Sequence, residues 1–330
     1  MNTRRFFVAT LALLIIGSAA FAQREDWPNS LTVGTASVGG TYFIYGGGWA
    51  NLIQQQLGVT TSTEVTGGPN QNMILVQNRN VELGMVTLGP AFEGFTGQGD
   101  WTGGMQMQDV RALFPMYDTP FHFVALERDG ISSVQDINGR SIGVGPAGGT
   151  PGTYNPRFLD ALGVERTDRL AGASDLASLL MDGQIDVFAF AAGVPISAFL
   201  EVEAQRNVVI FAFTEQEIET LLEQFPFASR STIPAGVYQS LDEDLETVGM
   251  YNFAIGHRDL PEDFVYEMVK ALFENIDFMV QTHQSARDTI PANIVKNEFL
   301  PFHPGAIRYY NEIGLEIPEN LYPPEYEAGN

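Results

Sequence analysis

Residues 33–41 read VGTASVGGT, and residues 142–150 read IGVGPAGGT. In both stretches a β-branched residue and a glycine are followed by four residues and then by Gly-Gly-Thr. A helix predicted over Asn70–Gln77, with the strand after it, also has a counterpart further along, around Leu176–Met181. Chance similarity between glycine-rich turns is the alternative, but the matched segments keep their order. The repeat therefore predicts two similar α/β lobes.

Strands and helices alternate along the N-terminal third of the chain. Leu31–Gly34 resembles a short buried strand, Tyr42–Leu57 has the apolar spacing of a helix, and Thr61–Thr66 alternates like a strand. A further strand is predicted over Val81–Thr87. This alternation predicts an α/β fold with mainly parallel sheets. Further along we expect a glycine-rich loop, two strands and two amphipathic helices, over residues 94–104, 112–116, 121–126, 214–223 and 262–282 in that order.

The N-terminus has the pattern of an export signal. Arg4 and Arg5 precede an apolar run over residues 6–16, and residues 20–22 read AFA, a small-residue cleavage site. This pattern predicts a signal peptide over residues 1–22, cleaved after Ala22. A retained anchor is the alternative, but the apolar run is short for a bilayer. We expect a periplasmic protein with no stable membrane anchor, exported by the general or the twin-arginine route.

Composition excludes several classes of function. The chain has no cysteine and a net charge of -23 at pH 7. Disulfides, thiol catalysis and a cysteine-linked lipid are therefore excluded, and the acidic surface opposes binding of nucleic acid. The four histidines lack metal-ligand spacing, and the motifs of the nucleophile elbow and of zinc proteases are missing. We expect no metal, no cofactor and no enzyme, although a scattered catalytic pair stays open.

Three glycine-rich turns lie between a predicted strand and a predicted helix, over Ser37–Tyr42, Gly67–Asn72 and Gly145–Thr153. The first N–H groups of a helix lack partners within it and carry positive potential, so they bind anions without lysine or arginine. Plain turns and caps are the alternative for each loop, but loops from two lobes favour a shared cleft. The candidate ligand-binding residues are Gly40, Thr41, Tyr42, Asn70, Asn72, Thr87, Gly149, Thr150, Thr153, Gly193 and Pro195.

The second copy also fits the dinucleotide fingerprint G-x-G-x-x-G over Gly143–Gly148. The first copy lacks the middle glycine, and no acidic residue stands clearly at the end of a following strand. We therefore do not expect a nicotinamide cofactor.

Several short motifs occur in a set order along the chain: residues 39–42, 66–68 with Asn72, 136–140, 193–195, 233–238, and 303–306 with Tyr309, Glu312 and Gly314. In this order they resemble the TAXI family, the solute receptors of one class of TRAP transporters. The resemblance implies a type II periplasmic-binding fold, in which two α/β lobes are joined by a hinge. It also implies a ligand such as glutamate, glutamine or a related dicarboxylate, delivered to an ion-gradient-driven TRAP membrane permease. Pro69 and the segment 148–151 depart from the family pattern, which removes or moves two hydroxyls expected near the ligand.

We expect the first lobe to contain residues 23–127 and 241–330, and the second lobe residues 128–240. The small organic anion would bind between them. A receptor for an ABC importer, an exported enzyme on the same fold and an apolar ligand are the alternatives.

Overall fold

The computed structural model describes residues 26–326 of the chain. Within them, strands pair in the order β2-β1-β3-β10-β4-β7-β5-β6, while β8 pairs with β4 and β9 with β10. The strands are Ser30–Gly34 (β1), Thr60–Glu64 (β2), Leu83–Thr87 (β3), Val110–Leu126 (β4), Arg140–Gly145 (β5), Arg166–Leu170 (β6), Val187–Ala191 (β7), Val208–Phe211 (β8), Ser229–Ile233 (β9) and Leu245–His257 (β10). The helices are Thr41–Leu57 (α2), Pro69–Gln77 (α3), Leu88–Thr96 (α4), Thr150–Ala161 (α5), Ala173–Met181 (α6), Ser197–Gln205 (α7), Glu215–Gln224 (α8), Glu262–Glu274 (α9), Ile276–Thr282 (α10) and Pro304–Glu312 (α11).

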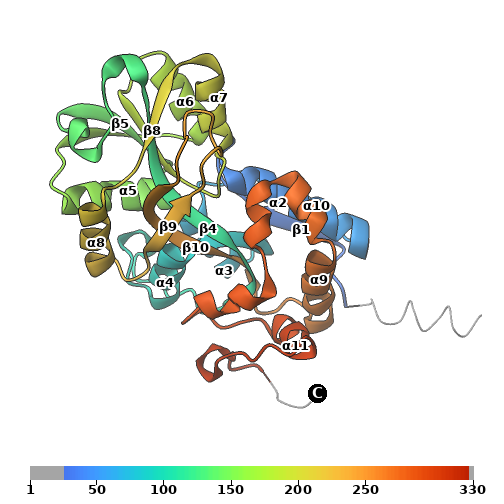
Figure 1. Cartoon of the computed structure of the whole chain (residues 1–330). Coiled ribbons are helices and arrows are strands. Elements are labelled where there is room, and N and C mark those ends of the chain that lie inside the picture. The colour runs from blue at the N-terminus through green and yellow to red at the C-terminus, as the bar shows by residue number, and fades with distance from the viewer. Residues whose placement is uncertain (1–25, 327–330) are drawn as a thin grey trace, which may run out of the picture.

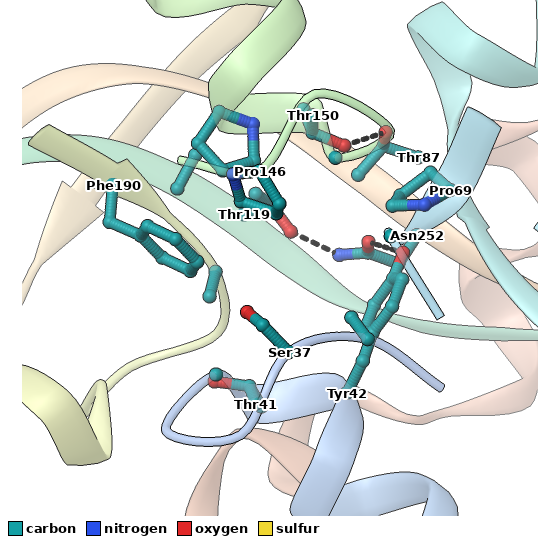
Figure 2. A pocket seen from close by; sticks show the side chains of 17 residues that line it. Ser37, Thr41, Tyr42, Pro69, Thr87, Thr119, Pro146, Thr150, Phe190 and Asn252 are labelled. Atoms are coloured by element: carbon teal, nitrogen blue, oxygen red, sulfur yellow. Dashed lines mark hydrogen bonds between the residues drawn. The ribbon is translucent and has the colours of Figure 1, made fainter. Parts of the chain in front are cut away.

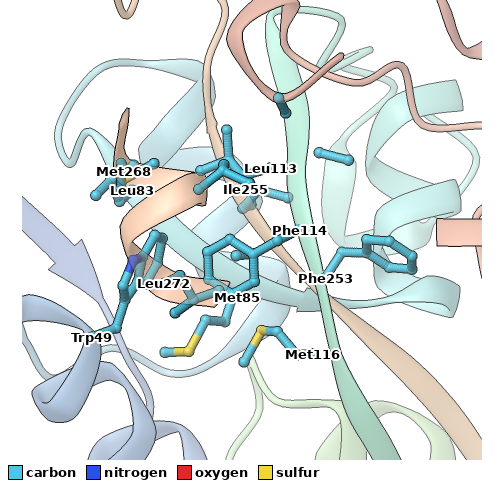
Figure 3. Packing of buried hydrophobic residues seen from close by; sticks show 14 of the residues in the cluster. Trp49, Leu83, Met85, Leu113, Phe114, Met116, Phe253, Ile255, Met268 and Leu272 are labelled. Atoms are coloured by element: carbon cyan, nitrogen blue, oxygen red, sulfur yellow. The ribbon is translucent and has the colours of Figure 1, made fainter. Parts of the chain in front are cut away.

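The buried apolar residues divide into cores that define two lobes. One core gathers β1, β3, the first part of β4, and helices α2, α9 and α11. Figure 3 shows its centre, where Trp49 of α2 and Leu272 of α9 face Phe114 of β4. Two further cores contain helices from α5 to α8 together with β7. We call the part around the first core the first lobe and the part around the other two the second lobe.

Two long strands join the lobes. Met116 and Tyr117 of β4 belong to the first core, whereas Phe121 and Phe123 of the same strand belong to the second lobe. β10 runs the other way, since Val248 and Met250 lie in the second lobe while Phe253 lies in the first core. Figure 1 shows both strands running between the green-to-yellow second lobe and the blue and orange first lobe. The lobe boundaries given from sequence stay a prediction.

The sheet is mixed, so the expectation of mainly parallel sheets is wrong for the joining strands. β1 pairs in parallel with β2 and β3, and β5 pairs in parallel with β6 and β7. β4 and β10 are antiparallel to each of their neighbours. The chain passes from the first lobe to the second along β4 and returns along β10, so these two strands run in opposite directions. The local alternation of strand and helix in the sequence does not reveal such joining strands.

Three further expectations need correction. Residues 94–104 are not entirely a loop, because α4 extends to Thr96. The strands expected over 112–116 and 121–126 are one strand, β4, which continues through Pro115 and Pro120. The helix expected over 262–282 is broken at Asn275 into α9 and α10. By contrast, β1, α2, β2, α3 and β3 lie within two residues of the expected bounds.

Candidate functional site in the cleft between the lobes

A small cavity between the lobes is lined by residues of both Gly-Gly-Thr loops. Its volume is about 30 Å³, which is room for roughly two water molecules. Both lobes contribute to its wall, and Figure 2 shows Thr41 and Tyr42 of the first lobe facing Pro146, Thr150 and Phe190 of the second. The lining residues are Ala36, Ser37, Gly40, Thr41, Tyr42, Gly67, Pro69, Thr87, Thr119, Pro146, Gly149, Thr150, Pro151, Phe190, Ala191, Ala192 and Asn252.

Four helices begin at this cavity. The residues that precede α2, α3, α4 and α5 are Gly40, Gly68, Thr87 and Gly149, and no side chain caps any of these four helices. Residues of each first turn or N-cap line the wall. The first N–H groups of these helices therefore supply positive potential, since they have no acceptor within their own helix. In α3 the first of them, that of Asn70, already donates to the carbonyl of Gly148. None of the lining residues has a charged side chain.

The prolines at the helix starts suit this geometry. Pro69 is the first residue of α3 and Pro151 the second residue of α5. Proline is favoured in the first turn because its missing N–H has no intrahelical partner there. The N–H groups of Thr150 and Gly152, either side of Pro151, remain as donors at the start of α5.

Polar side chains in the cavity are paired with one another. The hydroxyl oxygens of Thr87 and Thr150 lie 2.6 Å apart, which joins the lobes directly (Figure 2). The Tyr42 hydroxyl donates to Asn252 Oδ1 at 2.5 Å, and Asn252 Nδ2 donates to Thr119 Oγ1 at 2.5 Å. Burial raises the pKa of the Tyr42 phenol well above its ordinary value, so the phenol stays protonated as a donor.

The backbones of the two lobes also touch. The N–H of Asn70 donates to the carbonyl of Gly148 at 3.0 Å, and the Thr41 hydroxyl donates to the carbonyl of Gly193. A Cβ placed on Gly68 would lie 2.9 Å from the Cα of Gly149. Only glycine permits this approach, which explains the Gly-Gly pairs at residues 67–68 and 148–149.

Comparison with known proteins identifies the family. The model of the NMT1-like family matches residues 33–314. The chain belongs to the NMT1-like family. The periplasmic binding protein BugD superposes with a TM-score of 0.57 at 14% identity, over 88% of this chain and 99% of BugD. PhnD1 from Prochlorococcus marinus (MIT 9301), solved with methylphosphonate, superposes with a TM-score of 0.50 at 13% identity, over 79% of this chain and 91% of PhnD1.

These superpositions show the fold expected from sequence, that of a type II periplasmic solute-binding protein. No helix within residues 26–326 is long and apolar enough to cross a membrane. The signal peptide expected over residues 1–22 lies outside the described residues. In the same described part of this NMT1-like protein, no three His, Asp or Glu side chains are grouped as metal ligands.

The structure brings six of the eleven candidate ligand-binding residues to the cavity wall: Gly40, Thr41, Tyr42, Thr87, Gly149 and Thr150. Asn70 and Thr153 lie just behind it, where Asn70 Nδ2 donates to Thr153 Oγ1 at 3.0 Å. The Asn70 Oδ1 atom is buried and has no partner. Because Pro69 lines the cavity and Asn70 follows it, this unsatisfied acceptor adjoins the site.

Three candidates are not on the cavity wall. Asn72 accepts from Thr66 and donates to the carbonyls of Thr35 and Met85, so its side chain ties the loop after β1 to β3. Gly193 contributes only its carbonyl, which accepts from Thr41. Pro195 lines a different and larger cavity of about 830 Å³.

That larger cavity lies across β4 from the small one. Asp118 and Pro120 line it, whereas Thr119 between them lines the small cavity, as alternation along a strand requires. Burial raises the pKa of Asp118, and hydrogen bonds from Ser231 and Thr119 oppose this shift.

Sequence reasoning missed several wall residues, above all Thr119, Phe190 and Asn252. Asn252 comes from the middle of β10, in the buried run VGMYNFAI over residues 248–255. A lone amide within such a run was a usable signal, because a buried polar side chain needs hydrogen-bond partners. Ser37 falls within the first predicted anion loop but was not singled out.

Proposed function

We propose that this chain is a periplasmic solute receptor that captures a small organic anion, a carboxylate, between its two lobes. The observation that supports this most is the convergence of four uncapped helix N-termini on one cavity whose wall has no cationic side chain. Such an arrangement favours negative charge without lysine or arginine. The polar side chains around it that now pair with one another can exchange those partners for ligand atoms.

We further propose that the receptor belongs to the TAXI type and delivers its ligand to an ion-gradient-driven TRAP permease. This rests on the ordered motifs of the sequence, and it makes glutamate and glutamine the first compounds to test. Uptake by vesicles that contain the permease should stop when an ionophore collapses the ion gradient. Uptake that depends on ATP instead would identify an ABC importer.

We infer that residues 23–127 with 241–330 form the first lobe and residues 128–240 the second, apart from the parts of β4 and β10 that pack in the second lobe. We also infer that the signal peptide is removed after Ala22. Under this proposal the site binds and does not catalyse. NMR spectra of the ligand recovered after long incubation should be unchanged. Conversion of the ligand would instead support an exported enzyme on this fold.

Ligand binding is tested by thermal unfolding with a panel of small carboxylates, because a ligand of the folded state raises the melting temperature. Thr150→Val removes the hydroxyl that pairs with Thr87 across the lobes. We expect it to weaken binding by about 1–3 kcal/mol, since a buried partner is left unpaired.

Thr167→Val is the matched control, because Thr167 is exposed on β6, away from the cavity. It should bind as the unaltered protein does. The absence of any shift with every anion in the panel would contradict the proposed site.

A further inference from the structure

We propose that the cavity between the lobes selects small monocarboxylates that lack an amino group, such as short 2-oxo acids with an apolar body, over α-amino acids. This inference rests on the proposed function and narrows its ligand class. It also departs from the glutamate-like ligand that the sequence resemblance implies.

The first argument is the absence of a counter-charge for an ammonium group. No carboxylate lines the cavity. The nearby Glu93 is held by Arg157 at 2.5 Å, Trp101 Nε1 at 2.7 Å and the Tyr154 hydroxyl at 3.0 Å. Asp118 lies on the other face of β4, in the larger cavity. An α-ammonium would therefore be buried without a carboxylate partner beside four helix N-termini, which repel positive charge. The unsatisfied Asn70 Oδ1 beside the site is a neutral acceptor and supplies no counter-charge.

The second argument is that carbonyl groups around the cavity are already engaged. The carbonyl of Ser37 accepts from the N–H of Gly40 at 3.2 Å, and that of Pro146 accepts from the N–H of Gly149 at 2.9 Å. The carbonyls of Gly148 and Gly193 accept from Asn70 and Thr41 across the lobes. Each of these oxygens already accepts one hydrogen bond, so an ammonium could reach it only as a second donor.

The third argument is the apolar part of the wall. Ala36, Pro146, Phe190, Ala191 and Ala192 line the cavity. Figure 2 shows Phe190 and Pro146 across the cavity from Tyr42. This part of the wall suits a hydrocarbon body better than a second carboxylate. Together these features point to one carboxylate on an apolar body.

Calorimetric titration with matched pairs tests this inference, because each pair differs only in the group at C2: pyruvate and alanine, 2-oxoisovalerate and valine, 2-oxoglutarate and glutamate. We expect the oxo acid of each pair to bind at least tenfold tighter than its amino acid. Within the oxo acids, 2-oxoisovalerate should bind tighter than 2-oxoglutarate.

Equal or tighter binding of the amino acids would overturn the inference and leave the proposed receptor function standing. Tighter binding of 2-oxoglutarate than of 2-oxoisovalerate would overturn the monocarboxylate part. Binding of none of the six compounds would contradict both the inference and the proposed carboxylate site.

A charge introduced into the wall provides a second test. Ser37→Asp places a carboxylate at the cavity, so oxo acids should bind at least tenfold more weakly and the preference between valine and 2-oxoisovalerate should shift toward valine. Ser37→Asn is the neutral control of similar shape, and Ser178→Asp adds the same charge at an exposed position of α6. An unchanged preference in folded Ser37→Asp would contradict the inference. If that variant does not fold, the titrations of the three oxo-acid and amino-acid pairs on the unaltered protein test the inference.

Discussion

His303 shows how one side chain can make stability depend on pH. It is buried at the start of α11, where Nδ1 accepts from the N–H of Gly305 at 3.2 Å and Nε2 contacts the carbonyl of Leu260 at 3.0 Å. These partners require a neutral ring with its proton on Nε2. Burial lowers the pKa of His303 to about 4, while hydrogen bonds to backbone carbonyls oppose the shift.

We expect His303 to destabilise the protein as the pH falls from about 6.5 to about 4. The unfolded chain takes up a proton near pH 6.5, but the folded chain does so only near pH 4, so the unfolded state gains stability through this window. The full loss is about 3 kcal/mol. His303→Asn keeps an acceptor for the Gly305 N–H and does not titrate. Between pH 7.5 and pH 4.5, the free energy of unfolding of this variant in urea should fall less than that of the unaltered protein. An identical fall in the two proteins would contradict this account.

Among single residues, those cavity residues that follow a glycine-rich loop could be predicted from the sequence. Thr41 and Thr150 were found because a strand, a Gly-Gly pair and a helix are local patterns. Asn252 and Thr119 were not found, because they reach the cavity only through the pairing of β10 with β4, residues far apart in sequence. Asn72 was found but has another role. Its spacing resembles that of a ligand contact, whereas its hydrogen bonds join the loop after β1 to β3.

Among the elements, α11 and α9 make a contact that the motif HPGA over residues 303–306 explains. His303 caps α11, Pro304 is its first residue, and Gly305 allows the helices to approach closely. A Cβ on Gly305 would lie 2.2 Å from the carbonyl oxygen of Glu262 and 2.7 Å from the backbone nitrogen of Tyr266. This motif, one of those that carry the family resemblance, is therefore structural here and lies outside the cavity.

Gly305→Ala should lower the free energy of unfolding by about 1–3 kcal/mol or more, because backbone atoms cannot yield to the added methyl group without moving α11 from α9. Gly47→Ala is the matched control. Gly47 lies within α2 with no atom within 4 Å of the added Cβ, so alanine there should stabilise by about 0.5–1 kcal/mol. Denaturant midpoints measure both, and equal midpoints would refute the role given to Gly305.

Helices were predicted correctly from the sequence where characteristic residues mark both ends of the helix. α2 begins after Gly40 and ends at Leu57, before Gly58 in the left-handed region, at φ 73°. α4 was missed because its sequence, LGPAFEGFT, holds two glycines and a proline that are typical of loops. Its glycines have packing reasons, since a Cβ on Gly89 would lie 2.4 Å from the Tyr154 hydroxyl of the other lobe.

For the molecule as a whole, the repeat of residues 33–41 and 142–150 predicted two lobes, and the fold is that of a two-lobed solute-binding protein. The crossing strands were out of reach of the same reasoning. β4 has 17 residues and β10 has 13, and each passes from one hydrophobic core to the other. Polar residues do lie near each crossing, Asp118 and Thr119 in β4 and Asn252 in β10, but no local rule ties such residues to a change of lobe.

The glycine contact between the lobes should govern how far they close. A Cβ on Gly148 would lie 3.3 Å from the Cα, carbonyl carbon and carbonyl oxygen of Gly67 across the cleft, tighter than ordinary van der Waals contact. Gly148 does not occupy the left-handed region, so Gly148→Ala adds a steric contact without local strain. The closed form becomes less populated, and affinity falls with the population of the binding-competent state.

We therefore expect Gly148→Ala to have a larger radius of gyration in small-angle X-ray scattering and a weaker affinity for the bound carboxylate. Saturating ligand should bring its scattering back toward that of the unaltered protein, because the ligand favours the closed form. Gly47→Ala, which adds the same methyl group away from the cleft, should change neither quantity. Unchanged scattering and affinity in Gly148→Ala would mean that the glycine loops meet without limiting closure, and that the hydroxyl pair of Thr87 and Thr150 sets the distance between the lobes.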